Sequence, residues 1–352
     1  MLSSFVASRQ SLVLFAILAV AAVVRLLNLG ELGPFIDETG HLYAAVDYDF
    51  YPLLGRVQHG KVFGYMFFYP MAKWASDPFW TTRVVVALVG VATTAGIYFV
   101  LRRLANPVAA AIGGGIWALW PYVSFHDRMA LHDPLITFFI VFATILWLRA
   151  LERDARLESF GSGVLMGLAI GTKVSAAMYL LWFGFLLLAS LAGGDYRRTA
   201  RLFLFFVLGL VAPLASLASL IYTSLTNQNQ FADQFLNDGG GTGSRLTLFV
   251  LNLQKVFTWF RSYSSVPFVV LAVLSLIFCF RRPWGLHSAA AVTFVAVVLV
   301  HCLTLKVFFA RYLVPDLFFL LICVSLSLSA AWAHLASLRR EAAPSPEVPV
   351  AQ

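Results

Sequence analysis

The sequence predicts an all-α protein that crosses a membrane about ten times, and composition is the first reason. Of its 352 residues, 60% are hydrophobic and only 12% are charged, whereas a soluble domain carries about 25% charged residues. The mean hydropathy is +0.83, and several apolar runs reach about 20 residues, the length that one membrane-spanning helix needs. These runs are continuous rather than alternating, which excludes a β-barrel.

The apolar runs define ten predicted helices, and the fifth is short enough to be a partial or tilted span. In chain order they cover residues 9–27, 80–101, 107–124, 134–150, 160–172, 174–192, 200–224, 264–280, 286–304 and 312–336. We expect the first run to be retained, because Arg25 lies inside it and no small-x-small cleavage site follows. We expect residues 1–337 to form one membrane-embedded domain and the Pro- and Ala-rich residues 338–352 to form a disordered cytoplasmic tail.

Arginine-rich turns give the predicted orientation of these helices. If the N-terminus is cytoplasmic, one side receives Arg102, Arg103, Arg149, Arg153, Arg156, Arg197, Arg198, Arg201, Arg281, Arg282, Arg339 and Arg340. Such turns are typical of cytoplasmic loops, so the net charge of +8 does not require nucleic acid as a partner. The other side receives the long segments 28–79 and 225–263 and corners at 125–133, Lys173 and 305–311. This outer side carries nearly as many cations as the arginine-rich side, and the orientation of the helices does not explain them.

Two further patterns are predicted to be structural. The three cysteines, Cys279, Cys302 and Cys323, lie in predicted spans without CxxC spacing, so we expect buried packing residues rather than disulfides or metal ligands. The stretch "GGGTGSR" at residues 239–245 lacks the Gly-Lys-Ser/Thr ending of a nucleotide-binding loop. We expect a flexible surface loop there, with a substrate-gating loop as the alternative.

The first long outer segment contains "GPFIDETGH" at residues 33–41, which places Asp37, Glu38 and His41 beside a membrane helix. If residues 36–46 are helical, both carboxylates share a face with His41. A helix N-cap would explain Asp37 but would leave Glu38 unexplained. The spacing Glu-x-x-His also occurs in di-iron bundles, but those need a second copy, which this sequence lacks.

The corner "SFHDRMALHDPLITFF" at residues 124–139 brings together five ionisable side chains. They are His126, Asp127, Arg128, His132 and Asp133. Pro134 stands where helices often begin, so an N-cap is one interpretation of Asp133. Five ionisable groups exceed what a cap requires, and charges at membrane depth usually mark function.

Three more segments bring cations to the same side. Lys61 lies in "HGKVFGYMFFYP", Lys173 lies in "GLAIGTKVSAAMY", and Lys306 and Arg311 lie in "LTLKVFFARYLVPD". Anchoring at the membrane interface is the alternative interpretation of Lys61, Lys306 and Arg311, and an unpaired lysine without a function is the alternative for Lys173. Cations suit a phosphate, aromatic rings suit a lipid interface, and a nearby carboxylate suits removal of a proton from a hydroxyl. The pattern therefore predicts an amphiphilic substrate with a phosphate headgroup and a transferable group.

Six motifs in this order resemble the integral-membrane C-superfamily (GT-C) glycosyltransferases, in the branch of the protein O-mannosyltransferases and the lipid A aminoarabinose transferase. They are "FIDETGHLYAA", "GKVFGYMFFYP", "FWTTRVVVALVG", "DRMALHDPLITFF", "GLAIGTKVSA" and "ARYLVP". The family has a proline where this chain has Val62, and His41, His126 and Asp127 match no part of its pattern. The resemblance implies the GT-C fold, with short interfacial helices in a long first outer loop.

The resemblance also implies that a sugar is transferred with inversion, without a nucleotide, from a polyprenyl-phosphate donor to an acceptor hydroxyl outside the cytoplasm. Asp37 would be the catalytic base, and Glu38 would orient it. Lys61, Lys173 and Arg311 would bind the donor phosphate. The implied catalytic set is Asp37, Glu38 and Asp133, and the implied substrate-binding set is Lys61, Arg83, Arg128, Lys173, Lys306, Arg311 and Tyr312.

A divalent metal ion is the cofactor that the resemblance raises, with Glu38 and His41 as its candidate ligands. Metal use differs among relatives, and no local spacing decides it in this sequence. The resemblance further implies a multi-pass protein of the bacterial inner membrane, with its site facing the periplasm or the exterior. The acceptor would be a glycan, a lipid or a protein.

Two other functions stay open. A transporter or flippase for a lipid-linked sugar would carry charges near the bilayer midplane and often has inverted repeats, and this sequence shows neither. A non-catalytic assembly subunit would not need Asp37 and Asp133 together. We therefore favour the enzyme, although the sequence names neither the sugar nor the acceptor.

Overall fold

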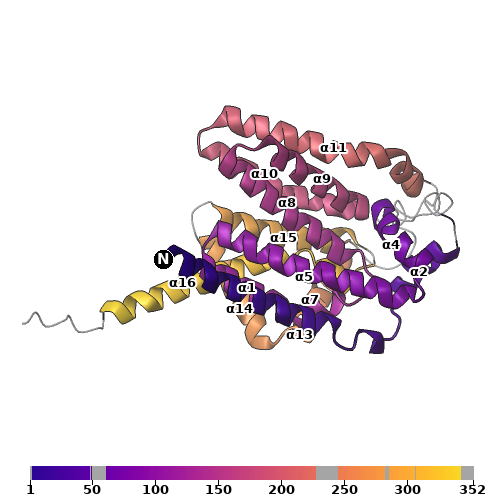
Figure 1. Ribbon diagram of the computed structural model, residues 1–352, viewed down its shortest axis with the longest axis horizontal. Helices are drawn as coiled ribbons and strands as arrows, with labels where there is room; N and C mark the ends of the chain where they lie inside the picture. The colour runs from indigo at the N-terminus through magenta and orange to yellow at the C-terminus, as the bar shows by residue number, and fades with distance from the viewer. Residues whose placement is uncertain are drawn as a thin grey trace, which may run out of the picture.

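A computed structural model describes residues 2–47, 49, 61–226, 245–281, 285–305 and 307–341. Within these ranges all regular elements are α-helices or short 3-10 helices, which confirms the all-α prediction. Figure 1 shows most helices running side by side along the long axis of the molecule. The N-terminus and the end of the last helix lie at one end of this bundle, and helices α2 and α4 lie at the other.

Each of the ten predicted spans corresponds to a helix in the structure. The helices are α1 (Leu2–Leu26), α5 (Pro78–Leu104), α6 (Pro107–Leu119), α8 (Asp133–Arg153), α9 (Arg156–Thr172), α10 (Leu180–Ala192), α11 (Tyr196–Thr226), α14 (Val266–Arg281), α15 (Leu286–Thr304) and α16 (Leu317–Glu341). Among the described residues, seven segments are long and apolar enough to cross a membrane, and α6 and α14 are shorter apolar helices. The chain is therefore a multi-pass membrane protein.

Local sequence signals set several helix ends. The side chain of Asp77 accepts a hydrogen bond of 2.9 Å from the backbone N–H of Trp80, and a proline follows it at the start of α5. At the other end of the chain, α16 continues to Glu341, so the predicted boundary after residue 337 falls inside this helix. Leucine and arginine favour a helix at this end of α16, and the next proline along the chain is Pro344. The rest of the predicted tail, residues 342–352, lies outside the described residues.

Short helices gather at the end of the bundle that holds α2 and α4. They are α2 (Ile36–Asp47), α4 (Val62–Trp74), α7 (Pro121–His126) and the 3-10 turns η1 (Leu29–Glu31), η2 (Val174–Tyr179) and η3 (Ala310–Leu313). Residues 36–46 are helical, as the predicted shared face of Asp37, Glu38 and His41 requires. Short helices in the first outer loop were also implied by the family resemblance.

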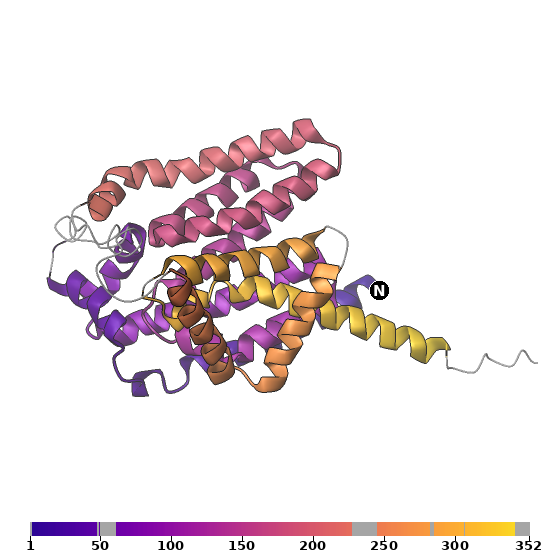
Figure 2. The same cartoon turned by 180° about the vertical axis from the view of Figure 1, so that it is seen from behind.

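One helix, α13 (Arg245–Tyr263), was not predicted, because the sequence suggested only a long outer connection at 225–263. Its buried side chains, Asn252, Val256 and Phe260, recur every fourth residue and face the bundle, where α13 packs on α15. Figure 2 shows α13 inclined to the bundle and joined to α14 by a tight turn. Most of the stretch predicted as a glycine-rich loop, residues 239–244, lies outside the described residues.

Helix α9, which ends one residue before Lys173, packs on α11 through glycines. A Cβ atom added to Gly163 would lie 1.9 Å from the carbonyl oxygen of Phe206, so only glycine permits this approach. The three cysteines are buried, as predicted.

Candidate active site

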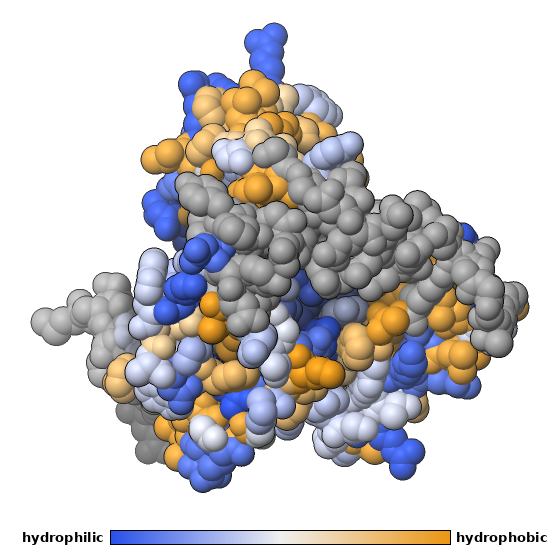
Figure 3. All heavy atoms as spheres, turned by 90° about the vertical axis from the view of Figure 1, so that its right-hand side faces the viewer, coloured by the Kyte–Doolittle hydropathy of each residue, from blue (hydrophilic) through white to orange (hydrophobic). Residues whose placement is uncertain are grey.

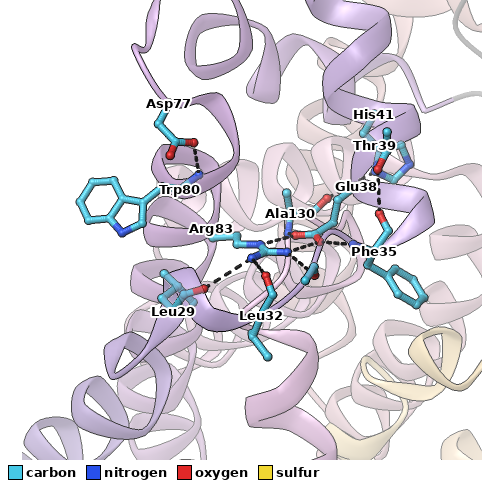
Figure 4. Close-up of polar contacts among 11 residues, drawn as sticks. Leu29, Leu32, Phe35, Glu38, Thr39, His41, Asp77, Trp80, Arg83 and Ala130 are labelled. Atoms are coloured by element: carbon cyan, nitrogen blue, oxygen red, sulfur yellow. Dashed lines mark hydrogen bonds and ion pairs between the residues drawn. The ribbon is translucent and has the colours of Figure 1, made fainter.

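The side chain of Glu38 lies in a closed hydrogen-bond network (Figure 4). Its Oε1 accepts from Nε of Arg83 at 2.8 Å and from the backbone N–H of Ala130 at 2.7 Å. Its Oε2 accepts from Nη2 of Arg83 at 2.6 Å and from the backbone N–H of Phe35 at 2.9 Å. Because Glu38 is fully buried and both oxygens are occupied, this carboxylate links α2 to α5 and to the segment before α8.

The guanidinium of Arg83 is also fully engaged. Its Nη1 donates to the carbonyl of Leu32 at 2.6 Å, and its Nη2 donates to the carbonyl of Gly33 at 2.9 Å. Arg83 thus fastens the chain between α1 and α2 onto α5. The sequence predicted Arg83 as a substrate-binding residue, and the structure places it in this network beside Glu38.

The neighbouring carboxylate, Asp37, faces a different group. Its Oδ2 accepts a hydrogen bond from Nη1 of Arg311, which lies in η3 near the other end of the sequence. The side chain of Asp37 is 25% exposed. An N-cap was one interpretation of Asp37. The structure does not support it, because α2 begins one residue earlier and the carboxylate of Asp37 points to Arg311.

Asp133 joins the same arginine to a lysine. Its Oδ1 lies 3.0 Å from Nζ of Lys173, and its Oδ2 lies 3.7 Å from Nε of Arg311. Helix α8 begins at Asp133 itself and His132 occupies the N-cap position, so the N-cap interpretation of Asp133 is wrong. Its two cationic partners, which the sequence separates widely, occupy the carboxylate instead.

Aromatic rings support these cations. Nζ of Lys173 lies 3.5 Å from the ring centre of Tyr312, and the guanidinium carbon of Arg311 lies 5.1 Å from the same ring. Both distances fit cation–π interactions. Tyr312, which was predicted as a substrate-binding residue, therefore lies under the two cations.

Lys61 precedes α4 and is half-buried near these groups. Burial, together with the charges of Lys173 and Arg311, lowers the pKa of Lys61 from 10.5 to about 8. In the part of the chain that the structure describes, no carboxylate oxygen lies within 4.0 Å of its ammonium. We call Asp37, Lys61, Asp133, Lys173 and Arg311 the cation cluster. Its three cations outnumber its two carboxylates, so the cluster can accommodate an added anion.

Figure 3 looks directly onto this end of the molecule. Hydrophilic residues lie in a recess near the centre of the view. One predicted site residue, Arg128, lies elsewhere. Nη2 of Arg128 donates to the carbonyls of Leu27 and Asn28 at 2.6 and 3.1 Å, at the end of α1, and Lys306 lies outside the described residues.

His41 lies in an aromatic cluster behind the site. Its ring centre is 4.0 Å from that of His132, and Tyr65 and Phe68 pack around both imidazoles. Burial and the charge of Lys61 lower the pKa of His41 to about 3, so its ring is neutral.

The predicted ligand pair Glu38 and His41 does not fit a metal ion. Both oxygens of Glu38 already accept two hydrogen bonds each. Moreover, the described residues contain no group of three or more His, Cys, Asp or Glu side chains that could hold an ion.

Sequence reasoning left Asp127 without a role, and the structure gives it one. Its Oδ2 lies 2.9 Å from Nε of Arg25, and both side chains are buried. The guanidinium of Arg25 also donates to the carbonyls of Ala118 and Trp117 at 3.0 and 3.2 Å, where α6 ends. This pair joins α1, α6 and α7, and an arginine inside an apolar run was the signal that could have revealed it.

A second buried group was also missed. Asp316 is fully buried, with Tyr179 and His301 beside it, and the ring centre of His301 lies 6.5 Å from that of Tyr312. A carboxylate at the start of one apolar run and an imidazole inside another were the available signals.

Comparisons with known proteins agree with this fold. The model of a family described as dolichyl-phosphate-mannose-protein mannosyltransferase matches residues 63–222. A polyprenol-phosphate-mannose–protein mannosyltransferase of Mycobacterium tuberculosis is 29% identical over 204 residues, covering 48% of this chain and 39% of that protein.

Two solved structures share the fold over most of this chain. A crystal structure of ArnT from Cupriavidus metallidurans bound to undecaprenyl phosphate has a TM-score of 0.60 and 18% identity, over 93% of this chain and 61% of ArnT. The archaeal oligosaccharyltransferase AglB from Archaeoglobus fulgidus has a TM-score of 0.59 and 13% identity, over 98% of this chain and 53% of AglB. The chain thus spans less than two thirds of the length of these relatives.

The fold defines the class: this is a polytopic membrane protein with the fold that ArnT and AglB share. The family model and the mycobacterial relative each match less than half of this chain, and both agree with the resemblance that the sequence motifs carry.

Proposed function

We propose that this protein is a glycosyltransferase that moves a sugar from a polyprenyl-phosphate donor to an acceptor hydroxyl. The observation that carries the proposal is the cation cluster, in which a partly exposed carboxylate, Asp37, lies beside an excess of positive charge. The mycobacterial relative is described as a polyprenol-phosphate-mannose–protein mannosyltransferase, and ArnT was solved bound to undecaprenyl phosphate. Both descriptions support a lipid-phosphate donor.

The donor phosphate binds among Lys61, Lys173 and Arg311. In the structure, Arg311 contacts Asp37, and Lys173 contacts Asp133. A phosphate offers Arg311 a bidentate partner, which is a strong hydrogen-bonding arrangement for a guanidinium. Donor binding therefore draws Arg311 away from Asp37 and leaves that carboxylate available to accept a proton.

Asp37 acts as the general base on the acceptor. As its carboxylate takes the hydroxyl proton, the acceptor oxygen bonds to the anomeric carbon from the side opposite the phosphate. The bond between that carbon and the phosphate oxygen breaks, and the electron pair leaves with the polyprenyl phosphate. The configuration inverts, and the cations stabilise the leaving charge without protonating it. Glu38 holds α2, and with it Asp37, in position.

The orientation follows from the arginine-rich turns at the opposite end of the helices. We propose that those turns face the cytoplasm and that the cation cluster faces the periplasm or the exterior of a bacterial inner membrane. The acceptor then is a glycan, a lipid or a protein on that side.

Transfer in proteoliposomes tests the proposal. Purified protein is supplied with polyprenyl-phosphate mannose labelled in the sugar, and the release of polyprenyl phosphate and the labelled acceptors are followed by mass spectrometry. We expect Asp37→Asn to lower transfer about 10²- to 10⁴-fold at a normal protein level. Asp154→Asn is a matched control, because Asp154 pairs with Arg198 and Arg201 in a turn between cytoplasmic helix ends.

Two outcomes contradict the proposal. Full transfer by Asp37→Asn removes the base assignment. Movement of the labelled donor across the bilayer, without transfer by the wild-type protein, identifies a flippase for the lipid-linked sugar.

A further inference from the structure

The buried carboxylate of Asp316 lies one residue before α16 and outside the cation cluster. Its Oδ1 accepts a hydrogen bond of 2.6 Å from the hydroxyl of Tyr179, and its Oδ2 lies 3.4 Å from Nδ1 of His301. An aspartate before a helix usually caps it. Here the backbone N–H groups of Phe318 and Phe319, which such a cap would bind, donate to backbone carbonyls instead. The carboxylate therefore has a different task.

The hydrogen bond between Tyr179 and Asp316 joins the two segments that carry the paired cations of the cluster. Tyr179 ends η2, which begins directly after Lys173. Asp316 follows η3, which contains Arg311. The bond links positions 137 residues apart in the sequence, so it fixes a distance that local structure does not set.

The same group of side chains reaches the underside of the cation cluster. The ring centre of His301 lies 6.5 Å from that of Tyr312, and Nζ of Lys173 lies 3.5 Å from the ring of Tyr312. On the other flank of η3, the hydroxyl of Tyr122 donates to the carbonyl of Ala310 at 3.0 Å. The segment that bears Arg311 is thus held from both flanks.

Stability alone does not account for a carboxylate in this place. Asp316 is fully buried, and among the described residues its Oδ2 has no hydrogen-bond partner. A buried polar group without its full set of partners costs free energy, and an apolar residue of similar size commonly stabilises a fold more. What Asp316 supplies is a fixed relation between η2 and η3.

We propose that Asp316 is a positioning residue that holds Lys173 and Arg311 at the spacing that one donor phosphate requires. This inference rests on the proposed function, because it assigns Lys173 and Arg311 to the donor. It adds a residue that touches neither the donor nor the acceptor and acts through the segments on either side.

Two substitutions in the full-length protein test the role of Asp316. Asp316→Ala removes the tether, and we expect it to raise the Kd for undecaprenyl phosphate and the donor KM about tenfold, with the acceptor KM unchanged. Asp316→Asn still accepts from Tyr179 and gains a donor for His301, so we expect values within about twofold of wild type. Ser329→Ala is the matched control, since it removes a 2.9 Å hydrogen bond to Asn106 elsewhere on α16.

The outcomes separate the possibilities. An unchanged Kd in folded Asp316→Ala overturns the inference, and so does equal weakening by Ala and Asn, which would indicate charge rather than tethering. If Asp316→Ala does not fold, Tyr179→Phe decides, because it removes only the hydroxyl; normal affinity there also overturns the inference. If wild-type protein binds no undecaprenyl phosphate, the proposed function fails first.

Discussion

Two adjacent carboxylates on α2 have opposite surroundings. Glu38 is fully buried, and Arg83 and two backbone N–H groups occupy both of its oxygens. Asp37 is a quarter exposed and contacts Arg311. Consecutive side chains on a helix point about 100° apart, so one faces the packed helix α5 and the other faces the cation cluster.

This difference separates a closed ion pair from an open one. In the closed pair, losing one partner leaves a charge buried without compensation. In the open pair, water or a ligand can replace the missing partner. Replacing Arg83 by alanine breaks the closed pair, and replacing Arg311 by alanine breaks the open one. We therefore expect different results from the two substitutions.

The largest effect is expected for Arg83→Ala. It leaves the buried carboxylate of Glu38 without its cation, and breaking such a pair costs about 3–5 kcal/mol. Thermal unfolding of the detergent-solubilised protein should show this as a lower Tm and a lower yield from membranes. The reverse control is the double substitution Arg83→Met with Glu38→Leu, which removes both charges and should recover part of the stability. A normal Tm for Arg83→Ala would contradict the closed network.

The effect next in size is expected for Arg311→Ala, and it concerns activity. Removing a group that stabilises the developing charge costs about 10²–10³ in kcat, or about 2.7–4 kcal/mol. The Tm should change little, because Asp37 is partly exposed and Asp133 keeps Lys173 as a partner. Transfer kinetics beside thermal unfolding make the measurement. If Arg311→Ala lowers the Tm as much as Arg83→Ala does, the distinction between the closed pair of Glu38 and Arg83 and the open pair of Asp37 and Arg311 is wrong.

The sequence predicted the parts of the fold that local composition determines. Runs of apolar residues near the required length give the membrane helices, since hydrophobicity acts on each segment independently. It did not predict α13, because its apolar residues alternate with polar ones such as Asn252 and Lys255, which lowers the average that marks a span. Only the fold, which supplies α15 as a packing partner, explains that helix.

The site could be predicted only by residue type and side of the membrane. Asp37, Asp133, Lys173 and Arg311 were expected on one face, and the structure brings these four together. The sequence could not separate the roles of Asp37 and Glu38, because neighbouring carboxylates look alike until their distant partners are known. Pairs formed across long stretches of sequence depend on tertiary packing, which single-residue patterns do not encode.

A smaller effect is expected for Gly64→Ala, because Gly64 packs closely against His132. A Cβ atom added to Gly64 would lie 2.5 Å from Cδ2 of His132, whose ring is stacked 4.9 Å from that of Phe68. The ring has little room to move, so Gly64→Ala should cost about 1–3 kcal/mol in stability. Because His132 precedes Asp133, the donor KM should also rise. Gly40→Ala on α2 is the control, since nothing lies within 4 Å of its added Cβ. Equal behaviour of the two variants would contradict the close contact.

The smallest effect is a pH dependence that belongs only to the open site. Lys61 has a pKa of about 8, so its ammonium is present below that pH and is lost above it. Since a phosphate prefers the charged form, donor kcat/KM should stay level up to about pH 8 and then fall by at most about tenfold per pH unit. His41, with a pKa of about 3, remains neutral throughout this range. Lys61→Gln should give a lower, flat profile; if it keeps the wild-type fall, another group titrates and Lys61 does not bind the phosphate.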